Sequence, residues 1–403
     1  MKTVSVIGMG YIGLPTATLL ASKGYQVAGM DVNPKVVDII NQGKIHIVEP
    51  DLDVAVHKAV ESGKLKAFTS PQKADIFILA VPTPFLADKK PDMTYVRKAA
   101  ESICTVLEAG NLVILESTSP IGATRVDVAE IIYAKRPELV GKLHIAHCPE
   151  RVLPGQILRE LVENDRVVGG VDEASTKTAA DFYRTFVKGE VLETTSDTAE
   201  MAKLTENAFR DVNIAFANEL SLICDKLGIN VWELIRLANR HPRVNILQPG
   251  PGVGGHCIAV DPWFIVAAAP EEAKLIRTAR EVNDGKPHWV VDKVMEAASK
   301  SATKPVIGLL GMAYKPDVDD LRESPSVEIA HALKRATNAE IIVCEPYVDA
   351  MNGFKLATLD ETLAQANILV MLTDHKPFKD ITLGQLAGKQ IIDTRGTFER
   401  VMG

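Results

Sequence analysis

The sequence predicts an α/β protein in which two doubly wound domains with parallel sheets are joined by a central domain built on a long helix. Three observations support this prediction. Short apolar runs alternate with helical segments from the N-terminus, the same alternation starts again after residue 300, and an unusually long helical pattern lies between them. At 403 residues the chain is long enough for two or three full-sized cores. We place the domains at residues 1–190, 191–300 and 301–403.

The first domain opens with a strand, a glycine-rich turn and a helix. Thr3–Gly8 is a short apolar strand, Gly8–Gly13 fits the pattern G-x-G-x-x-G, and Leu14–Lys23 has a helical composition. In such a Rossmann-like unit the glycines let the backbone approach a pyrophosphate, whose charge lies at the helix N-terminus. A second strand ends at Asp31, roughly 20 residues beyond the glycines, where an acid accepts ribose hydroxyls. This spacing predicts NAD as the cofactor, because the acid would repel the extra phosphate of NADP.

Further apolar strands continue the first sheet to about residue 147. They are Val27–Met30, Ile76–Val81, Leu112–Glu116 and Leu143–His147. Thr83 and Thr118 follow two of these strands, and the carboxyl ends of strands face the ligand in doubly wound sheets. Both threonines are therefore candidates for contacts to cofactor or substrate. The competing interpretation is an N-cap, in which the hydroxyl only starts a helix.

A long helix is predicted from about residue 198 to residue 227. Its apolar residues at helical spacing are Met201, Leu204, Ala208, Val212, Ala215 and Phe216. Such a helix commonly buries one side against another domain or subunit. Lys203, Asn207 and Arg210 share another face of it, and a solvated stripe is the ordinary interpretation of such polar residues.

The alternation of strands and helices returns in the third region. The strands are Pro305–Gly311, Ile341–Cys344, Ile368–Leu372 and Gln390–Asp393, with a helix from about Ser326. Because the full glycine pattern is missing here, we expect this half to bind a different nucleotide-like ligand. Lys315 and Arg322 could contact its phosphates, although bases close to several acids are by default surface charge.

Composition restricts the class of partner. A net charge of −7 and a pI near 5.8 argue against nucleic acid or an anionic membrane as the main partner. The uncharged segment Val4–Ser22 contains the glycine motif and Pro15 and lacks a basic leader, so we expect neither a membrane span nor a signal peptide. The five cysteines are odd in number and form no C-x-x-C pair, which favours a reducing cytoplasm.

A cysteine lies in a second glycine-rich segment, Gly252–Asp261, which reads Gly-Val-Gly-Gly-His-Cys-Ile-Ala-Val-Asp. A positioned thiolate can trap an aldehyde as a thiohemiacetal, which can lose a second hydride. Together with a dinucleotide site, Cys257 therefore indicates oxidation of an alcohol to an acid in one site. We interpret His256 as a structural residue of the loop. No second Cys or His pair stands at zinc spacing, so we predict no catalytic metal.

Several long motifs in order along the chain resemble the UDP-glucose/GDP-mannose dehydrogenase family. The motifs are Cys148–Gly155, Ala199–Arg210, His241–Asn245, Gly250–Cys257, Gly311–Lys315 and Arg322–Ser324. The resemblance implies an N-terminal NAD domain, a central helical domain that forms a homodimer, and a C-terminal domain that binds a UDP-sugar. It also implies a four-electron oxidation of the sugar at C6.

The same resemblance implies catalytic roles. Cys257 matches the nucleophile, and Lys203 and Asn207 match the groups that stabilise the developing oxyanion. Asp261 matches an acid that helps to position or activate water and the cysteine. Glu150 matches the acid proposed to assist hydrolysis of the thioester. Which residue acts as the base in the first oxidation stays open.

Binding residues are implied in the same way. The implied NAD contacts are Gly8, Gly10, Tyr11, Ile12, Gly13, Asp31, Thr83, Thr118 and Arg322. The implied UDP-sugar contacts are Arg151, Val152, Lys203, Asn207, Arg210, His241, Arg243, Gly254 and Lys315. Thr118 also matches a catalytic hydroxyl that organises water. Pro154 departs from the glutamate that UDP-glucose dehydrogenases commonly carry, which puts a glucose substrate in doubt and fits the acetamido-sugar branch.

Two other functions compete with this one. A two-electron hydroxyacid dehydrogenase of the 6-phosphogluconate type also joins a Rossmann domain to long helices, but leaves the cysteine motif and the third domain unexplained. A catalytically silent protein that binds NAD or a UDP-sugar is the other alternative. The NADH formed per substrate separates the three functions, because they predict two, one and none.

Overall fold

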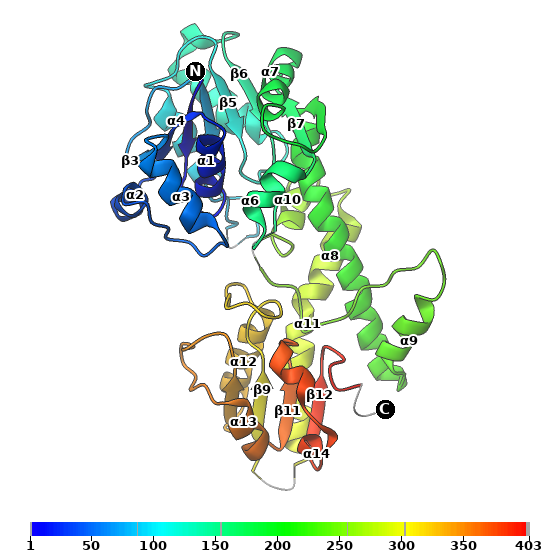
Figure 1. The fold of residues 1–403 in the computed structure, drawn as a ribbon. Helices are drawn as coiled ribbons and strands as arrows, with labels where there is room; N and C mark the ends of the chain where they lie inside the picture. Colours follow the sequence, from blue (N-terminus) through cyan, green and yellow to red (C-terminus); the bar gives the residue numbers. More distant parts are fainter. Residues whose placement is uncertain (1, 87, 154, 256, 302–303, 400–403) are drawn as a thin grey trace. The chain divides into compact units, whose positions relative to one another are not determined.

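The computed structural model describes residues 2–86, 88–153, 155–255, 257–301 and 304–399. The chain divides into two compact units, one of residues 1–206 with 267–269 and the other of residues 207–266 with 270–403. The long helix α8 (Ser196–Leu227) starts in the first unit and ends in the second (Figure 1). Within the described residues, no helix is both long and apolar enough to span a bilayer.

The first unit is built on an eight-stranded sheet with the order β3-β2-β1-β4-β5-β6-β7-β8. The strands are β1 (Thr3–Ile7), β2 (Gln26–Met30), β3 (Leu65–Phe68), β4 (Ile76–Leu79), β5 (Leu112–Leu115), β6 (His144–His147), β7 (Arg166–Gly170) and β8 (Val191–Thr195). All neighbours pair in parallel except β6 and β7, which are antiparallel. The expected parallel sheet is therefore confirmed, with one antiparallel pair added.

Helices cover both faces of this sheet. They are α1 (Gly13–Ser22), α2 (Pro34–Asn41), α3 (Leu52–Glu61), α4 (Thr94–Ile103), α5 (Glu130–Lys135), α6 (Ile157–Glu163) and α7 (Glu173–Tyr183), with a π-helical segment Thr124–Ala129 before α5. Alternate residues of the central strands enter two separate cores: Ile76 and Ile78 pack with α1, α3 and α6, whereas Phe77 and Leu79 pack with α4 and α5. The first domain is thus doubly wound, as predicted.

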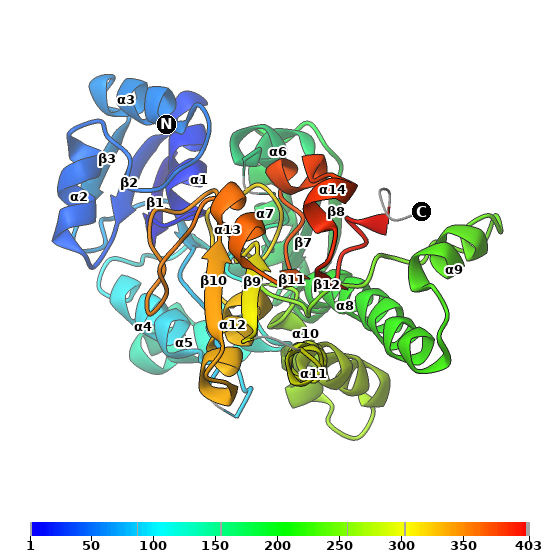
Figure 2. The same cartoon turned by 90° about the horizontal axis from the view of Figure 1, so that it is seen from below.

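The second unit contains the rest of α8 and a smaller sheet. Its helices before the sheet are α9 (Val231–Ala238), α10 (Asp261–Ala268, whose end belongs to the first unit) and α11 (Lys274–Ser299). The sheet comprises β9 (Val306–Leu310), β10 (Glu340–Cys344), β11 (Ile368–Met371) and β12 (Gln390–Asp393). These strands are parallel in the order β10-β9-β11-β12 (Figure 2). All four strands predicted from the sequence are confirmed.

Helices also lie on both faces of the smaller sheet. The C-terminal half of α11 and α12 (Pro325–Ala336) share one core with the sheet. The helices α13 (Leu359–Gln365) and α14 (Leu383–Leu386) share the other core. The C-terminal domain is therefore a second doubly wound domain, as the sequence predicts.

Candidate active site

The three glycines of the first motif have different structural roles. Gly8 follows β1 with φ +92°, and a Cβ there would lie 2.4 Å from the Ala80 carbonyl oxygen. A Cβ on Gly13 would lie 1.8 Å from the Gly8 carbonyl oxygen, so only glycine lets α1 start this close to β1. A Cβ on Gly10 would meet nothing within 4 Å. Gly10 therefore leaves open space at the turn, where a dinucleotide pyrophosphate would lie.

Asp31 lies beside this turn at the end of β2. Its Oδ2 accepts a hydrogen bond from the Met9 N–H (3.1 Å), and its Oδ1 accepts one from the Asn33 N–H (2.9 Å). The carboxylate is only half-buried, so it keeps a face toward solvent. Tyr11, which is 46% exposed, and the half-buried Ile12 belong to the same turn. The position of Asp31 suits contacts to ribose hydroxyls.

The loops after β4 and β5 meet at the same edge of the sheet. The Ser117 hydroxyl accepts from the Val81 N–H (2.9 Å) and donates to the Val81 carbonyl (2.7 Å). Thr83 and Thr118 follow these bonded residues and are half-buried. Neither hydroxyl belongs to a residue that caps a described helix, so the N-cap interpretation does not account for them. Sequence reasoning missed Ser117, because only the pairing of β4 with β5 brings it against Val81.

Glu150 follows β6 and is buried in an ion pair. Its Oε2 accepts from an Arg166 Nη (2.7 Å), and its Oε1 accepts from the Arg151 N–H (2.6 Å). The carboxyl group of Glu116 is also buried and accepts from the Tyr183 hydroxyl at 2.9 Å. Burial, followed by the negative charge of Glu150, raises the pKa of Glu116 to about 7. The structure thus adds to Glu150 a buried guanidinium and a second carboxyl group that titrates near neutral pH.

Arg151, an implied substrate contact, is held inside the first unit. It forms an ion pair with Glu206 of α8 (2.7 Å) and donates to the Asp165 carbonyl. The loop that carries Arg151 is fixed further along by Glu49, whose two carboxylate oxygens accept from the N–H groups of Gly155 and Ile157 (2.8 Å each). Val152 packs against the first core.

Lys203 lies on α8 with only 9% of its surface exposed, so it does not belong to a solvated stripe. Three residues earlier, the fully buried Glu200 accepts hydrogen bonds from the Gly122 N–H (2.6 Å) and the Thr124 N–H (2.7 Å). Burial raises the pKa of Glu200 to about 7. These bonds fix the first turns of α8 against the loop that follows Thr118.

In the second unit, three of the predicted catalytic residues lie together. The Asn207 amide donates to Asp261 Oδ2 at 2.6 Å, and Asp261 is buried. The Cys257 carbonyl accepts from the Val260 and Asp261 N–H groups (3.0 and 2.9 Å), which places Cys257 in the turn that leads into α10. The thiol of Cys257 is exposed, whereas the other four cysteines are buried. A position before a helix N-terminus favours the thiolate form of a cysteine.

The glycines before Cys257 allow close backbone packing. A Cβ on Gly254 would lie 2.4 Å from the Glu323 carbonyl oxygen, and a Cβ on Gly255 would lie 3.0 Å from the Tyr314 ring. The start of this loop is fixed by a hydrogen bond from the Gly250 N–H to the buried Asn218 amide oxygen (2.8 Å). The loop is therefore packed against the C-terminal domain of its own unit.

The remaining binding residues are more exposed. The Arg322 guanidinium forms a two-point ion pair with Asp320 (2.8 Å for each bond), and Lys315 extends over the Tyr314 ring at 5.6 Å. Arg210, His241 and Arg243 are exposed. His256 and Pro154 lie outside the described residues.

Comparison with known proteins matches all three parts of the chain to one family. Residues 2–187 match its NAD binding domain, residues 197–285 its central domain and residues 308–400 its UDP binding domain. The chain belongs to the UDP-glucose/GDP-mannose dehydrogenase family. The resemblance drawn from the motifs is thus confirmed, and the protein is an NAD-dependent dehydrogenase of this family.

Relatives named for their activities align with almost the whole chain. It is 56% identical to the UDP-N-acetyl-D-mannosamine dehydrogenase of Escherichia coli (strain K12), over 98% of this chain and 99% of that protein. It is 55% identical to an NDP-N-acetyl-D-galactosaminuronic acid dehydrogenase of Ralstonia nicotianae, over 98% and 96%. Among solved structures, a UDP-D-ManNAc dehydrogenase from Pyrococcus horikoshii is similar with a TM-score of 0.88 and 40% identity, over 98% and 96%.

Proposed function

We propose that this member of the family oxidises UDP-N-acetyl-D-mannosamine at C6 to UDP-N-acetyl-D-mannosaminuronate, through a thiohemiacetal and a thioester on Cys257. The observation that carries the proposal is the exposed Cys257 thiol at the start of α10, next to the bonded pair Asn207 and Asp261. Bound NAD supplies the chemistry of hydride acceptance, and two molecules of it are needed to take an alcohol to an acid. Gly8, Gly10, Gly13 and Asp31 would hold it.

The protein's own residues would provide the remaining chemistry. The Lys203 ammonium and the Asn207 amide would stabilise negative charge on the substrate oxygen. The Cys257 thiolate would add to the aldehyde carbon, and loss of hydride from the resulting carbon would leave a thioester. Water would then hydrolyse the C–S bond, with Glu150 and Thr118 assisting and Asp261 accepting a proton, so that the acid leaves and the thiol is restored.

The identity of the sugar rests on the relatives and on Pro154. Relatives of 56% identity are named for the mannosamine sugar, whereas relatives of 55% identity are named for N-acetyl-D-galactosaminuronic acid. The nucleotide sugar of N-acetyl-D-galactosamine is therefore our second candidate substrate. A site that hydrogen-bonds an acetamido group discriminates against a plain hydroxyl by up to roughly 10⁴-fold, so UDP-glucose should be a poor substrate.

Initial rates with a panel of UDP-sugars, read as NADH, test this function. We expect the highest kcat/KM for UDP-N-acetyl-D-mannosamine and two NADH per sugar. A higher kcat/KM for the galactosamine sugar would move the assignment to the second candidate. One NADH per sugar, or none, with every sugar would contradict the four-electron chemistry itself.

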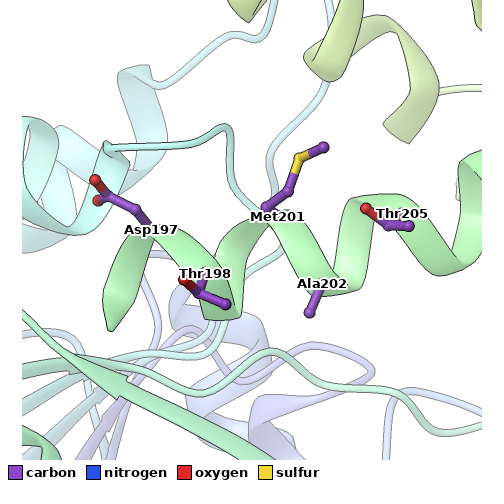
Figure 3. Close-up of a pocket in the computed structure, with 5 residues that line it drawn as sticks. All are labelled: Asp197, Thr198, Met201, Ala202 and Thr205. Carbon is purple, nitrogen blue, oxygen red and sulfur yellow. The ribbon is translucent and has the colours of Figure 1, made fainter. Parts of the chain in front are cut away.

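We also propose that the protein forms a homodimer through its central helices. Phe209, Phe216 and Ile223 lie seven residues apart on α8 and are 71%, 52% and 46% exposed, so they form one apolar stripe. Ala202 lies seven residues before Phe209 and continues the stripe toward the start of α8. There it lines a pocket of about 520 Å³ with Asp197, Thr198, Met201 and Thr205 (Figure 3). A second copy of the chain would cover this stripe. Light scattering should show a dimer for the wild type and a monomer for Phe216→Glu.

The domain boundaries 1–190, 191–300 and 301–403 are part of the same proposal. The matched segments lie on either side of the two boundaries: one ends at residue 187 and the next begins at 197, and that one ends at residue 285 and the last begins at 308. Limited proteolysis should cut first near residues 190 and 300.

A further inference from the structure

The C-terminal domain repeats the strand, glycine turn and acid of the NAD domain. Gly311 follows β9 with φ +85°, as Gly8 follows β1 with φ +92°. The Gly311 N–H donates to the Cys344 carbonyl on β10 (2.9 Å), as the Gly8 N–H donates to the Met30 carbonyl on β2 (2.8 Å). An acid, Glu345, directly follows β10 in the place that Asp31 has after β2.

Glu345 is almost fully occupied by bonds inside the domain. It is 5% exposed, and its Oε2 accepts from the N–H groups of Met312 (2.6 Å) and Ala313 (3.0 Å). Its Oε1 accepts from the Tyr347 N–H (3.0 Å). The His375 Nε2 lies 3.0 Å from Glu345 Oε2. This acid is therefore not available to a ligand's ribose.

His375 links Glu345 to the far end of the same segment. The His375 Nδ1 accepts from the Asp317 N–H at 2.9 Å, so the ring proton is on Nε2 and is donated to Glu345. The ring is fully buried beside the rings of Tyr347 and Phe378, with centroids 4.9 and 5.5 Å away. The Tyr347 hydroxyl donates to Asp317 Oδ1 (2.9 Å). Both ends of the segment Met312–Asp317 are thereby bonded to one buried pair.

The segment between these bonds carries Tyr314 and Lys315. Tyr314 packs against the loop before Cys257: a Cβ on Gly254 would lie 3.0 Å from the Tyr314 Cβ, and a Cβ on Gly255 would lie 3.0 Å from its ring. A shift of Tyr314 would therefore move the backbone that leads to the thiol. Lys315 is the residue of this segment for which the family resemblance implies a contact to the nucleotide sugar.

We propose that Glu345 and His375 are positioning residues, which hold the segment Met312–Asp317 so that Lys315 is placed for the nucleotide sugar and Tyr314 fixes the Cys257 loop. The part that concerns Lys315 rests on the proposed function. The part that concerns Cys257 rests only on the packing of Tyr314 against the two glycines.

Two measurements on the full-length protein separate these parts. The first is the affinity for UDP, measured by titration calorimetry. The second is the rate of alkylation of Cys257 by iodoacetamide, which reports on this thiol because the other four cysteines are buried. The variants are Glu345→Gln and His375→Ala, with His375→Gln as the conservative variant. Glu340→Gln, at the exposed start of the same strand, is the matched control.

Glu345→Gln would remove the anionic acceptor of three backbone N–H groups, and the new amide NH₂ would turn a donor toward one of these donors or His375. We expect UDP affinity to fall about tenfold, since a hydrogen bond to a charged group contributes roughly that factor. We expect alkylation of Cys257 to change by several-fold and KM for NAD to stay the same. His375→Gln keeps a donor toward Glu345. Its UDP affinity and its rate of Cys257 alkylation should therefore lie closer to the wild-type values than those of His375→Ala.

Circular dichroism and thermal unfolding establish that each variant is folded. If Glu345→Gln does not fold, His375→Gln and His375→Ala carry the test. Folded variants that bind UDP and react at Cys257 like Glu340→Gln would overturn the proposal. If the wild type binds no UDP and oxidises no UDP-sugar, the proposed function fails, while the alkylation rates still decide the role of the pair toward Cys257.

Discussion

In the NAD domain and in the C-terminal domain, an acid directly follows the second strand, which pairs with the first, but the two acids have different roles. Asp31 accepts hydrogen bonds from two backbone N–H groups, and its side chain stays half-exposed beside the open glycine turn. Glu345 is buried and also bonded to His375. The position of an acid after a strand therefore does not decide whether it binds a ligand. The partners that reach it from other strands decide this.

The turns before the acids differ in the same sense. In the NAD domain, α1 begins at Gly13, directly after the glycine turn, so its N-terminus lies close to the site. In the C-terminal domain, residues 311–324 separate β9 from α12. This longer segment provides Tyr314 and Lys315, and it needs internal fixing that the short turn does not need.

The largest effect on activity should come from removing the thiol while leaving the NAD domain intact. In Cys257→Ser, formation of the uronate should fall by at least roughly 10³-fold, because a hydroxyl is a far weaker nucleophile than a thiolate. The Kd for NAD, measured by fluorescence titration, should match that of the wild type. Turnover to the acid at the wild-type rate would remove Cys257 from the mechanism.

Next in size is a difference in pH dependence between two buried acids. The raised pKa of Glu116, about 7, means that its protonated form stabilises the fold below the ordinary glutamate pKa, and that this stability is lost as pH rises through 7. Burial alone would raise the pKa of Glu345, but hydrogen bonds from His375 and the Met312 N–H outweigh it and lower the pKa. The ionised Glu345 therefore contributes stability above the ordinary glutamate pKa, and this stability is lost as the pH falls through its lowered pKa.

Unfolding by urea from pH 5 to 8 tests this opposition. At pH 5 the free energy of unfolding of Glu116→Gln should be slightly lower than that of the wild type. Toward pH 8 it should rise relative to the wild type by about 1–3 kcal/mol. Glu345→Gln should be destabilised over the whole range. Parallel pH curves for Glu116→Gln and the wild type would show that Glu116 is ionised in the folded protein.

Loss of the half-exposed Asp31 carboxylate should weaken binding of the cofactor. Asp31→Ala should weaken NAD binding about tenfold and narrow the preference over NADP, because the carboxylate accepts ribose hydroxyls and repels a 2′-phosphate. Affinity for UDP should not change. The exposed Asp38→Ala on α2 is the matched control. An NAD/NADP ratio of kcat/KM equal to that of the control would place Asp31 outside the cofactor site.

The smallest effect on stability should follow from Gly10→Ala. Because a Cβ there meets no protein atom within 4 Å, the free energy of unfolding should change by less than about 0.5 kcal/mol, while NAD binding weakens. Gly254→Ala, whose Cβ would lie 2.4 Å from a carbonyl oxygen, should lower the melting temperature by several degrees. Equal melting temperatures for these two variants would contradict the packing described for the Cys257 loop.

The sequence determined the local elements of the protein. Continuous apolar runs predicted the buried strands β1, β4, β5 and β11, because both faces of these strands are covered. Three strands were missed. The edge strands β3 and β8 alternate with exposed residues or are largely exposed, and β7 begins with a charged arginine and ends in two glycines. The glycine spacing with Asp31 predicted the NAD domain, and the order of the motifs predicted the family, because both depend on residues close together in the chain.

The tertiary structure alone decided which acids are free to act. Glu49 and Ile157 are 108 residues apart, Glu200 and Thr124 are 76 apart, and Glu345 and His375 are 30 apart. No local pattern marks these pairs, because a carboxylate is buried only when segments from different strands close around it. Desolvation and the hydrogen bonds formed at that moment set its pKa and its availability to a ligand. For this reason the spacing after the glycines predicted Asp31 and the family resemblance implied Glu150, but neither pointed to Arg166, Glu116 or His375.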